Sequence, residues 1–513
     1  MVVPSQQYLS TRASGEPYLL FEATVLRGLA PGGGLFIPSE IPKLPSDFLT
    51  KWKDLSFQEL AFEIFSLYIS RDEVSADDLK FLIAKSYATF RTDDVTPLVD
   101  LDQEKNLYLL ELFHGPTYAF KDVALQFVGN LFEYFLERKN AKKPETSNRD
   151  RLTVVGATSG DTGSAAIYGL RNKKDVSIFI LHPLGKVSPI QELQMTTVTD
   201  PNVHNFAVKG NFDDCQDIVK TLFDDVEFNE KHHLGAVNSI NWARILAQIT
   251  YYFYSYFSFI RKTAKSDPTV RYVVPTGNFG DILAGFYAKR MGLPIDKLIV
   301  ATNANDILDR FWKSGVYEKN APEASADAVK ETLSPAMDIL ISSNFERLLW
   351  YLAREQLAKT NEEAGNILLQ WMVELKTKGK VVVPQAVLNA GLKEFASESV
   401  SDEQTIKTIK EIYDRSSGYI LDPHTSVGVT ASLRHVDGQN TYISLSTAHP
   451  AKFGDAVDRA LKDNDEYSFD KVLPDDFKVL ESLPKNVTII EKPDKELVKD
   501  AIESELKNEG IVF

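Results

Sequence analysis

Short apolar runs alternate with segments of helical periodicity along most of the chain after residue 96. One helical pattern begins after Phe120 and another occupies 164–170. Strand-like runs flank both patterns. These runs, rich in β-branched and other apolar residues, occupy 106–112, 152–155, 176–181, 272–275, 298–302 and 442–446. Strands that alternate with helices form parallel sheets, so the pattern predicts an α/β fold with two parallel subdomains.

The amino-terminal part departs from this pattern. Two acidic helical stretches, near 56–71 and 75–89, follow one another without strands between them. We therefore predict a small separate domain over 1–95, a smaller α/β subdomain over 96–210 and a larger one over 211–513.

Four other segments are predicted individually. The apolar stretch 245–260 is interrupted by polar residues and is shorter than the roughly 20 residues that span a bilayer, which predicts a buried aromatic helix. The polar, acidic segments 318–330 and 397–404 are predicted as surface loops. A strand followed by an amphipathic helix is expected over 485–513.

Composition narrows the classes of function. Lys and Arg number 57 against 72 Asp and Glu, a formal net charge of −15, and such a surface repels nucleic acids and anionic membranes. The single cysteine, Cys215, cannot form an intrachain disulfide, and the first residues lack a secretory or organellar pattern. We expect a cytoplasmic protein that binds neither nucleic acid nor membrane, with Cys215 in its core.

Two Gly-rich loops each follow a strand-like run and precede a helix. They lie at 154–166 and 273–284. Backbone N–H groups at a helix start favour anions, so each loop is a candidate phosphate cradle, with an ordinary tight turn as the alternative. The spacing of a nucleotide P-loop and that of a dinucleotide fingerprint are both missing.

Lys121 stands at the head of a strongly apolar helix. The helix dipole and desolvation both disfavour an ammonium group there, and a neutral amine is what a Schiff base with a carbonyl cofactor requires. The alternative is a lysine that extends from the helix into solvent. The eight histidines form no metal-binding pattern, and no Gly-x-Ser-x-Gly elbow is present. We expect no metal.

Five co-linear segments carry a family resemblance. They read His-Gly-Pro-Thr-Tyr-Ala-Phe-Lys-Asp at 114–122, Ala-Thr-Ser-Gly-Asp-Thr-Gly-Ser at 157–164, Asn-Ser-Ile-Asn-Trp-Ala-Arg at 238–244, Pro-Thr-Gly-Asn-Phe-Gly-Asp at 275–281 and Leu-Ser-Thr-Ala-His-Pro at 445–450. Together with 8–12 and 28–38 they resemble threonine synthases of the longer fungal and enterobacterial form. The resemblance implies pyridoxal 5'-phosphate, fold type II, as in the tryptophan synthase β family, and a small N-terminal domain.

The resemblance also assigns roles to individual residues. Lys121 forms the Schiff base with pyridoxal phosphate, and Thr447 meets its pyridine nitrogen. The cradle for the cofactor phosphate comprises Gly277, Asn278, Phe279 and Gly280. The implied substrate-binding residues are Thr158, Ser159, Asp161, Thr162, Lys186, Asn238, Ser239, Asn241 and Arg244.

The implied reaction converts O-phospho-L-homoserine and water to L-threonine and phosphate, the last step of threonine biosynthesis, in a monomer or homodimer. Lys121 acts as the base that moves protons on the substrate. The nearest alternative is a phospho-lyase or threonine dehydratase on the same scaffold. A non-catalytic metabolite sensor is disfavoured by the retained lysine, and a kinase by the missing Walker-type lysine.

Overall fold

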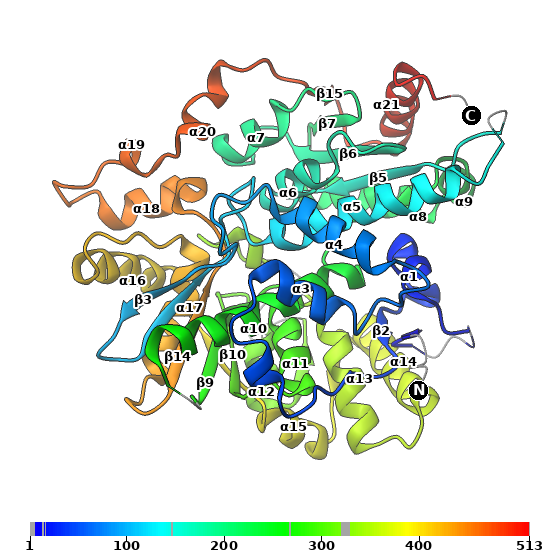
Figure 1. The fold of residues 1–513 in the computed structure, drawn as a ribbon. Coiled ribbons are helices and arrows are strands. Elements are labelled where there is room, and N and C mark those ends of the chain that lie inside the picture. Colours follow the sequence, from blue (N-terminus) through cyan, green and yellow to red (C-terminus); the bar gives the residue numbers. More distant parts are fainter. Residues whose placement is uncertain are drawn as a thin grey trace.

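A computed structural model of the chain describes residues 6–12, 15, 17–144, 147–265, 268–319 and 329–511. Two larger β-sheets dominate it, one above the other in Figure 1, with helices around both. This arrangement confirms the predicted α/β class with two parallel subdomains.

The first sheet has six strands in the order β13-β10-β9-β14-β4-β3. Its strands are β3 (Leu98–Asp102), β4 (Leu107–Glu111), β9 (Val270–Pro275), β10 (Ile295–Thr302), β13 (Phe395–Ser399) and β14 (Thr441–Ser446). All pairs are parallel except β3 with β4. The central strands are buried on both faces, as expected for a parallel sheet covered by helices.

The second sheet has five parallel strands in the order β15-β7-β6-β5-β8. They are β5 (Leu152–Ala157), β6 (Val176–Pro183), β7 (Val203–Val208), β8 (Leu234–Gly235) and β15 (Thr488–Ile490). Strands β3 and β4 thus belong to the six-stranded sheet, and β8 and β15 to the five-stranded one. Sheet membership therefore does not follow the predicted boundaries at 96 and 210, and the proposed domain limits stay a prediction.

Helices cover both sheets. Those that precede strand β9 in the chain are α1 (Phe21–Arg27), α2 (Phe48–Lys51), α3 (Phe57–Phe65), α4 (Ala76–Tyr87), α5 (Lys121–Asn140), α6 (Asp161–Leu170), α7 (Pro189–Thr196), α8 (Phe212–Asp224), α9 (Val226–His232) and α10 (Trp242–Thr263). The others are α11 (Gly280–Met291), α12 (Ile307–Ser314), α13 (Phe345–Gln356), α14 (Asn361–Lys378), α15 (Gln385–Leu392), α16 (Asp402–Arg415), α17 (Pro423–His435), α18 (Gly454–Leu461), α19 (Phe469–Val472), α20 (Asp475–Lys478) and α21 (Lys495–Asn508).

Helix α10 is the buried aromatic helix that the sequence predicts. It lies between the two sheets and packs against α3, α5 and α11. Asn241 caps its first turn by accepting a hydrogen bond from the N–H of Ala243 at 3.1 Å. Most residues of α10 are buried, so the helix is a central part of the core that these neighbouring helices share.

The amino-terminal part docks on α10 and on the α13 region. Strands β1 (Tyr8–Ser10) and β2 (Phe36–Pro38) form an antiparallel pair, and a second small pair joins β11 (Val316–Glu318) to β12 (Lys380–Val382). Arg12 forms an ion pair with the buried Glu346 at 2.7 Å. The α3 helix starts with a capping box between Ser56 and Glu59, which matches the helical prediction near 56–71.

Three of the predicted segments have different outcomes in the structure. The prediction of a surface loop at 397–404 is wrong, because its first residues belong to edge strand β13, which pairs with β10, and Asp402 starts α16. Polar residues fit an edge strand with one open side, which the loop prediction overlooked. Most of the predicted loop 318–330 lies outside the described residues. The predicted carboxy-terminal strand and helix are confirmed as β15 and α21.

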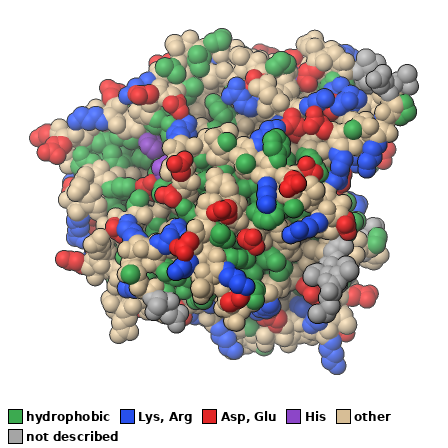
Figure 2. All heavy atoms as spheres, in the orientation of Figure 1, with side chains coloured by type: hydrophobic (Ala, Val, Ile, Leu, Met, Phe, Trp, Pro, Cys, Tyr) green, Lys and Arg blue, Asp and Glu red, His purple; other side chains and the backbone are tan. Residues whose placement is uncertain are grey.

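Acidic and basic side chains are interspersed over the face shown in Figure 2. No helix of the described residues is both long and apolar enough to cross a membrane.

Candidate active site

Four segments that follow the carboxyl ends of strands meet at one place. They follow β4, β9 and β14 of the six-stranded sheet and β5 of the five-stranded sheet. The N–H of Phe120 donates to the carbonyl of Thr447 at 2.8 Å, and Lys121 Nζ lies 3.8 Å from Asp161 Oδ2. Carboxyl ends of parallel strands are the usual location of ligand sites in α/β folds.

Lys121 is the first residue of α5 and is buried. Burial lowers the pKa of its amine to about 8, and the nearby Arg244 and Lys452 cations act in the same direction, while Asp161 opposes them. This confirms the predicted effect of desolvation on the lysine, whereas the alternative of an amine extended into solvent is excluded by its burial. At neutral to mildly alkaline pH, part of the amine is therefore unprotonated and nucleophilic.

The segment from Gly277 to Gly280 forms a narrow turn before α11. A Cβ atom on Gly277 would lie 3.0 Å from the carbonyl oxygen of Ala336, so the backbone there approaches a neighbouring segment closely. Phe279 adopts a left-handed conformation with φ of 64°, and its ring packs against Phe345. A helix leaves its first N–H groups without an intrahelical acceptor, so this turn presents anion-binding groups.

Asn344 joins two of the predicted segments and was not predicted from the sequence. Its fully buried side-chain amide donates to the carbonyl oxygens of Asn278 at 2.9 Å and Ser239 at 3.2 Å. Asn278 itself is half-buried and accepts a hydrogen bond from Ser343 on its side-chain oxygen. The candidate phosphate turn and the segment 238–244 are thereby held together.

Thr447 follows β14 and is buried. Its N–H donates to the hydroxyl of Thr425 at 3.1 Å, and the Thr425 hydroxyl in turn donates to Asp422. Because its carbonyl accepts from Phe120, Thr447 is fixed beside the residue that precedes Lys121.

The loop 158–162 is organised by Thr158. Its buried hydroxyl accepts hydrogen bonds from the N–H groups of Gly160 at 2.9 Å and Gly163 at 2.8 Å. Ser159 is exposed and Thr162 is half-buried. The carboxylate of Asp161 points toward Lys121 and repels anions, so the groups that this loop could offer to an anion are its N–H groups and hydroxyls.

Arg244 and Asn241 are both buried at the start of α10, but they make different contacts. Arg244 donates to the carbonyl of Val237 at 3.0 Å, and its Nε atom is buried without a hydrogen-bond partner among the described residues. Burial lowers the pKa of this guanidinium to about 10. Asn241 uses its side-chain N–H to bond Val25 at 2.9 Å and its oxygen to cap α10, so both ends of its amide are engaged within the protein.

The other predicted substrate residues are less buried than Arg244 and Asn241. Asn238 and Lys186 are exposed, and Ser239 is half-buried. Lys186 lies in the turn after β6, and no ion pair between described residues includes it. Two buried residues that contact Asp161, namely Lys452 and Gln191, were missed by the sequence analysis.

The residues present fit an aldehyde cofactor that carries a phosphate group. Lys121 supplies a buried amine with a lowered pKa. The absence of a side chain at Gly277 lets the turn before α11 pack closely against the carbonyl of Ala336. This combination, on two parallel α/β subdomains of fold type II, defines a pyridoxal-phosphate-dependent enzyme. The family model "Pyridoxal-phosphate dependent enzyme" matches residues 91–392.

Within this class the chain belongs to the threonine synthase family. The models "Threonine synthase N terminus" and "Threonine synthase, C-terminal" match residues 7–87 and 425–502. A threonine synthase of Saccharomyces cerevisiae is 60% identical over 514 residues, which cover 98% of each chain.

Solved structures agree with this membership. The crystal structure of threonine synthase from yeast has a TM-score of 0.93 and 59% sequence identity, and the match covers 98% of this chain and 99% of that one. A pyridoxal-phosphate-bound threonine synthase from Brucella melitensis has a TM-score of 0.87 and 40% identity, with coverage of 98% and 99%.

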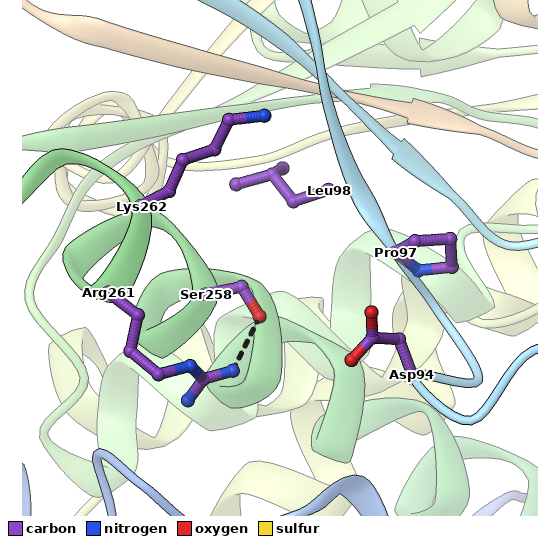
Figure 3. A pocket seen from close by; sticks show the side chains of 6 residues that line it. All are labelled: Asp94, Pro97, Leu98, Ser258, Arg261 and Lys262. Atoms are coloured by element: carbon purple, nitrogen blue, oxygen red, sulfur yellow. Dashed lines mark hydrogen bonds between the residues drawn. The ribbon is translucent and has the colours of Figure 1, made fainter.

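A separate cavity lies near the end of α10. It measures about 330 Å³, and Figure 3 shows its lining side chains, which are Asp94, Pro97, Leu98, Ser258, Arg261 and Lys262. Its charged groups are already engaged, since Lys262 pairs with Asp100 at 2.9 Å and Arg261 donates to Ser258 at 2.9 Å. We therefore assign no ligand to it. Among the described residues, no group of three or more His, Cys, Asp or Glu side chains is arranged to hold a metal ion.

Proposed function

We propose that this chain converts O-phospho-L-homoserine and water to L-threonine and phosphate, with pyridoxal phosphate bound at Lys121. The observation that carries the proposal is the buried amine of Lys121, which lies beside a loop with anion-binding groups and in one site with a second such turn at 277–280. Two anion sites fit a reaction in which both the cofactor and the substrate carry a phosphate. Membership of the threonine synthase family supports the same choice.

Bound pyridoxal phosphate supplies an electron sink for negative charge that develops on substrate carbon. The N–H groups at Gly277, Asn278, Phe279 and Gly280 hold its phosphate. Thr447 meets the pyridine nitrogen with a hydroxyl, which donates or accepts a hydrogen bond without adding charge.

Lys121 then serves two roles. It would hold the cofactor covalently through its buried amine, and as a free amine it would act on substrate protons. With a pKa of about 8, this amine is suited to take up and return protons near neutral pH, first at the α carbon and then at the β carbon of the substrate.

The substrate is held by groups from two segments. Ser159 and Thr162 offer N–H and hydroxyl groups to its anionic ends, on a loop that the Thr158 hydroxyl holds in shape. Arg244 offers a guanidinium fork with one buried N–H still available. Asn238, Ser239 and Lys186 complete the anion site from its margin. Asn241 acts indirectly, because its amide is engaged in capping α10 and bonding Val25.

The cytoplasmic location and the monomeric or homodimeric state predicted from the sequence remain part of this proposal. The charge of −15 and the single cysteine support the former.

The assignment of Lys121 is tested by Lys121→Ala. We expect the variant to fold, to lose the absorbance band of lysine-bound cofactor and to lose turnover, because the residue acts through covalent chemistry. Lys462→Ala, which removes an exposed lysine next to α18, is the control and should retain both. Turnover by Lys121→Ala at the rate of the unmodified chain would refute the assignment.

A further inference from the structure

Lys452 is a buried lysine that no part of the proposed reaction uses. It lies on a short 3-10 helix, Pro450–Phe453, shortly after β14. Its side chain is 0% exposed, forms an ion pair with Asp161 Oδ1 at 2.8 Å and donates to the carbonyl of Thr117 at 2.8 Å. Burying an ammonium group costs free energy unless the group is paired in this way. The two contacts therefore explain why the protein tolerates a buried lysine here, but they do not explain what Lys452 does.

Asp161 is oriented by the contacts of one of its two oxygens. Oδ1 accepts hydrogen bonds from Lys452 and, at 2.7 Å, from Gln191. Oδ2 is left on the side of Lys121, 3.8 Å from its Nζ. Gly160 makes room for Gln191, because a Cβ atom at residue 160 would lie 2.3 Å from the Gln191 side-chain oxygen.

The Asp161–Lys452 pair also connects the two sheets. Lys452 follows β14 of the six-stranded sheet, and Asp161 heads α6 directly after β5 of the five-stranded sheet. Although burial raises the pKa of the Asp161 carboxyl, the Lys452 and Lys121 cations outweigh that effect and hold this pKa well below its usual range. Asp161 is therefore a fixed negative charge beside Lys121.

Besides burial, charged groups among the described residues act on the Lys121 amine. Asp161 on α6 and Asp122 on α5 favour the ammonium form, whereas Arg244 on α10 and Lys452 disfavour it. Removing Lys452 would leave the Asp161 charge without its partner, next to the amine.

We propose that Lys452 is a positioning residue of the active site, which holds the Asp161 carboxylate in place and offsets its charge, so that Lys121 can lose its proton near neutral pH. This inference rests on the proposed function in one respect, the covalent attachment of pyridoxal phosphate to Lys121.

The test measures how pH controls attachment of the cofactor to the full-length chain. Protein freed of cofactor is mixed with pyridoxal phosphate over a range of pH, and the rate is followed by the absorbance of lysine-bound cofactor. The midpoint of this pH profile reports loss of the Lys121 proton. Lys452→Met should move the midpoint upward by about one unit, the order expected for losing one nearby charge. Asp161→Asn should move it downward.

Opposite shifts distinguish this role from a purely structural one, which would not give the two variants opposite signs. Lys462→Met, at an exposed position, is the matched control and should leave the midpoint in place. An unchanged or lowered midpoint in folded Lys452→Met, or shifts of both variants in the same direction, would overturn the proposal.

A double variant keeps the test decisive if Lys452→Met does not fold. Replacing both members of a buried ion pair by neutral residues is better tolerated than replacing one. The midpoint of Asp161→Asn/Lys452→Met should be higher than that of Asp161→Asn alone, and equal midpoints would overturn the proposal. If the unmodified chain and Lys121→Ala show the same absorbance, the cofactor assignment itself fails, which is a different result.

Discussion

Asp281 provides a test of how burial controls charge in this site. It lies in the first turn of α11, next to the turn 277–280. Its Oδ1 accepts hydrogen bonds from Tyr251 at 2.5 Å and Tyr252 at 3.1 Å, while Oδ2 is buried without a hydrogen-bond partner among the described residues. Burial raises the pKa of this carboxyl to about 7, and the two tyrosine hydroxyls only partly oppose the effect.

The perturbation is Asp281→Asn, which keeps the shape and the acceptor but cannot ionise. Between pH 4 and 7 the folded wild-type protein holds a proton on Asp281 that the unfolded chain has lost, so raising the pH lowers its free energy of unfolding. The pKa rises from 3.8 to about 7, and a shift of roughly three units corresponds to at most about 4 kcal/mol. Asp281→Asn cannot ionise at this position, so its free energy of unfolding does not fall with rising pH for this reason.

The assay is urea unfolding of cofactor-free protein at several pH values, followed by tryptophan fluorescence. The stability of Asp281→Asn relative to wild type should increase between pH 4 and 7, by up to about 4 kcal/mol, and stay constant above pH 7. Asp455→Asn, an exposed carboxylate in the first turn of α18, should show no such increase. A difference between Asp281→Asn and wild type that does not vary with pH would refute the reasoning.

Two other predictions concern the anion sites. Arg244→Ala should raise the KM for O-phospho-L-homoserine by tenfold or more, about 1.4 kcal/mol, and leave cofactor affinity nearly unchanged. Steady-state kinetics and cofactor titration measure the two quantities, with Arg459→Ala, at an exposed position, as the control. Equal losses in KM and in cofactor affinity would mean that Arg244 is structural. Gly277→Ala should weaken pyridoxal phosphate binding by about tenfold, because a Cβ atom 3.0 Å from the Ala336 carbonyl forces the turn to shift. The control Gly156→Ala meets its nearest neighbour at 3.5 Å and should bind the cofactor normally; normal binding by Gly277→Ala would show that the turn is not the cradle.

Much of the local structure could be predicted from the sequence. The helix that begins at Lys121, the turn before α11 and the buried helix α10 follow from apolar periodicity and from glycines at strand ends. The lowered pKa of Lys121 was also predicted, because its apolar neighbours in the helix already indicate desolvation.

Long-range pairing could not be predicted in the same way. The partner of Asp161 is Lys452, which reaches it from the other sheet, and the residues next to Lys452 in the chain do not indicate this pairing. Strands β3 and β8 join sheets that their positions in the chain do not indicate. The polar strand β13 looks like a loop in the sequence because an edge strand needs few apolar residues.

Asn241 shows a related limit. The family resemblance assigned it to the substrate, together with its neighbours in the segment 238–244. In the structure its amide bonds Val25 and the first turn of α10. A motif groups residues that lie close in the chain, but only the three-dimensional contacts separate those that face a ligand from those that hold the segment in place.

Product identity tests the proposed function most directly. The purified full-length chain is supplied with pyridoxal phosphate and O-phospho-L-homoserine, and L-threonine, 2-oxobutyrate and phosphate are quantified over time. We predict L-threonine and phosphate in equal amounts, with Lys121→Ala forming neither. Formation of 2-oxobutyrate as the main product would place the chain among phospho-lyases or dehydratases, and that result, or the absence of both products, would contradict the proposed reaction.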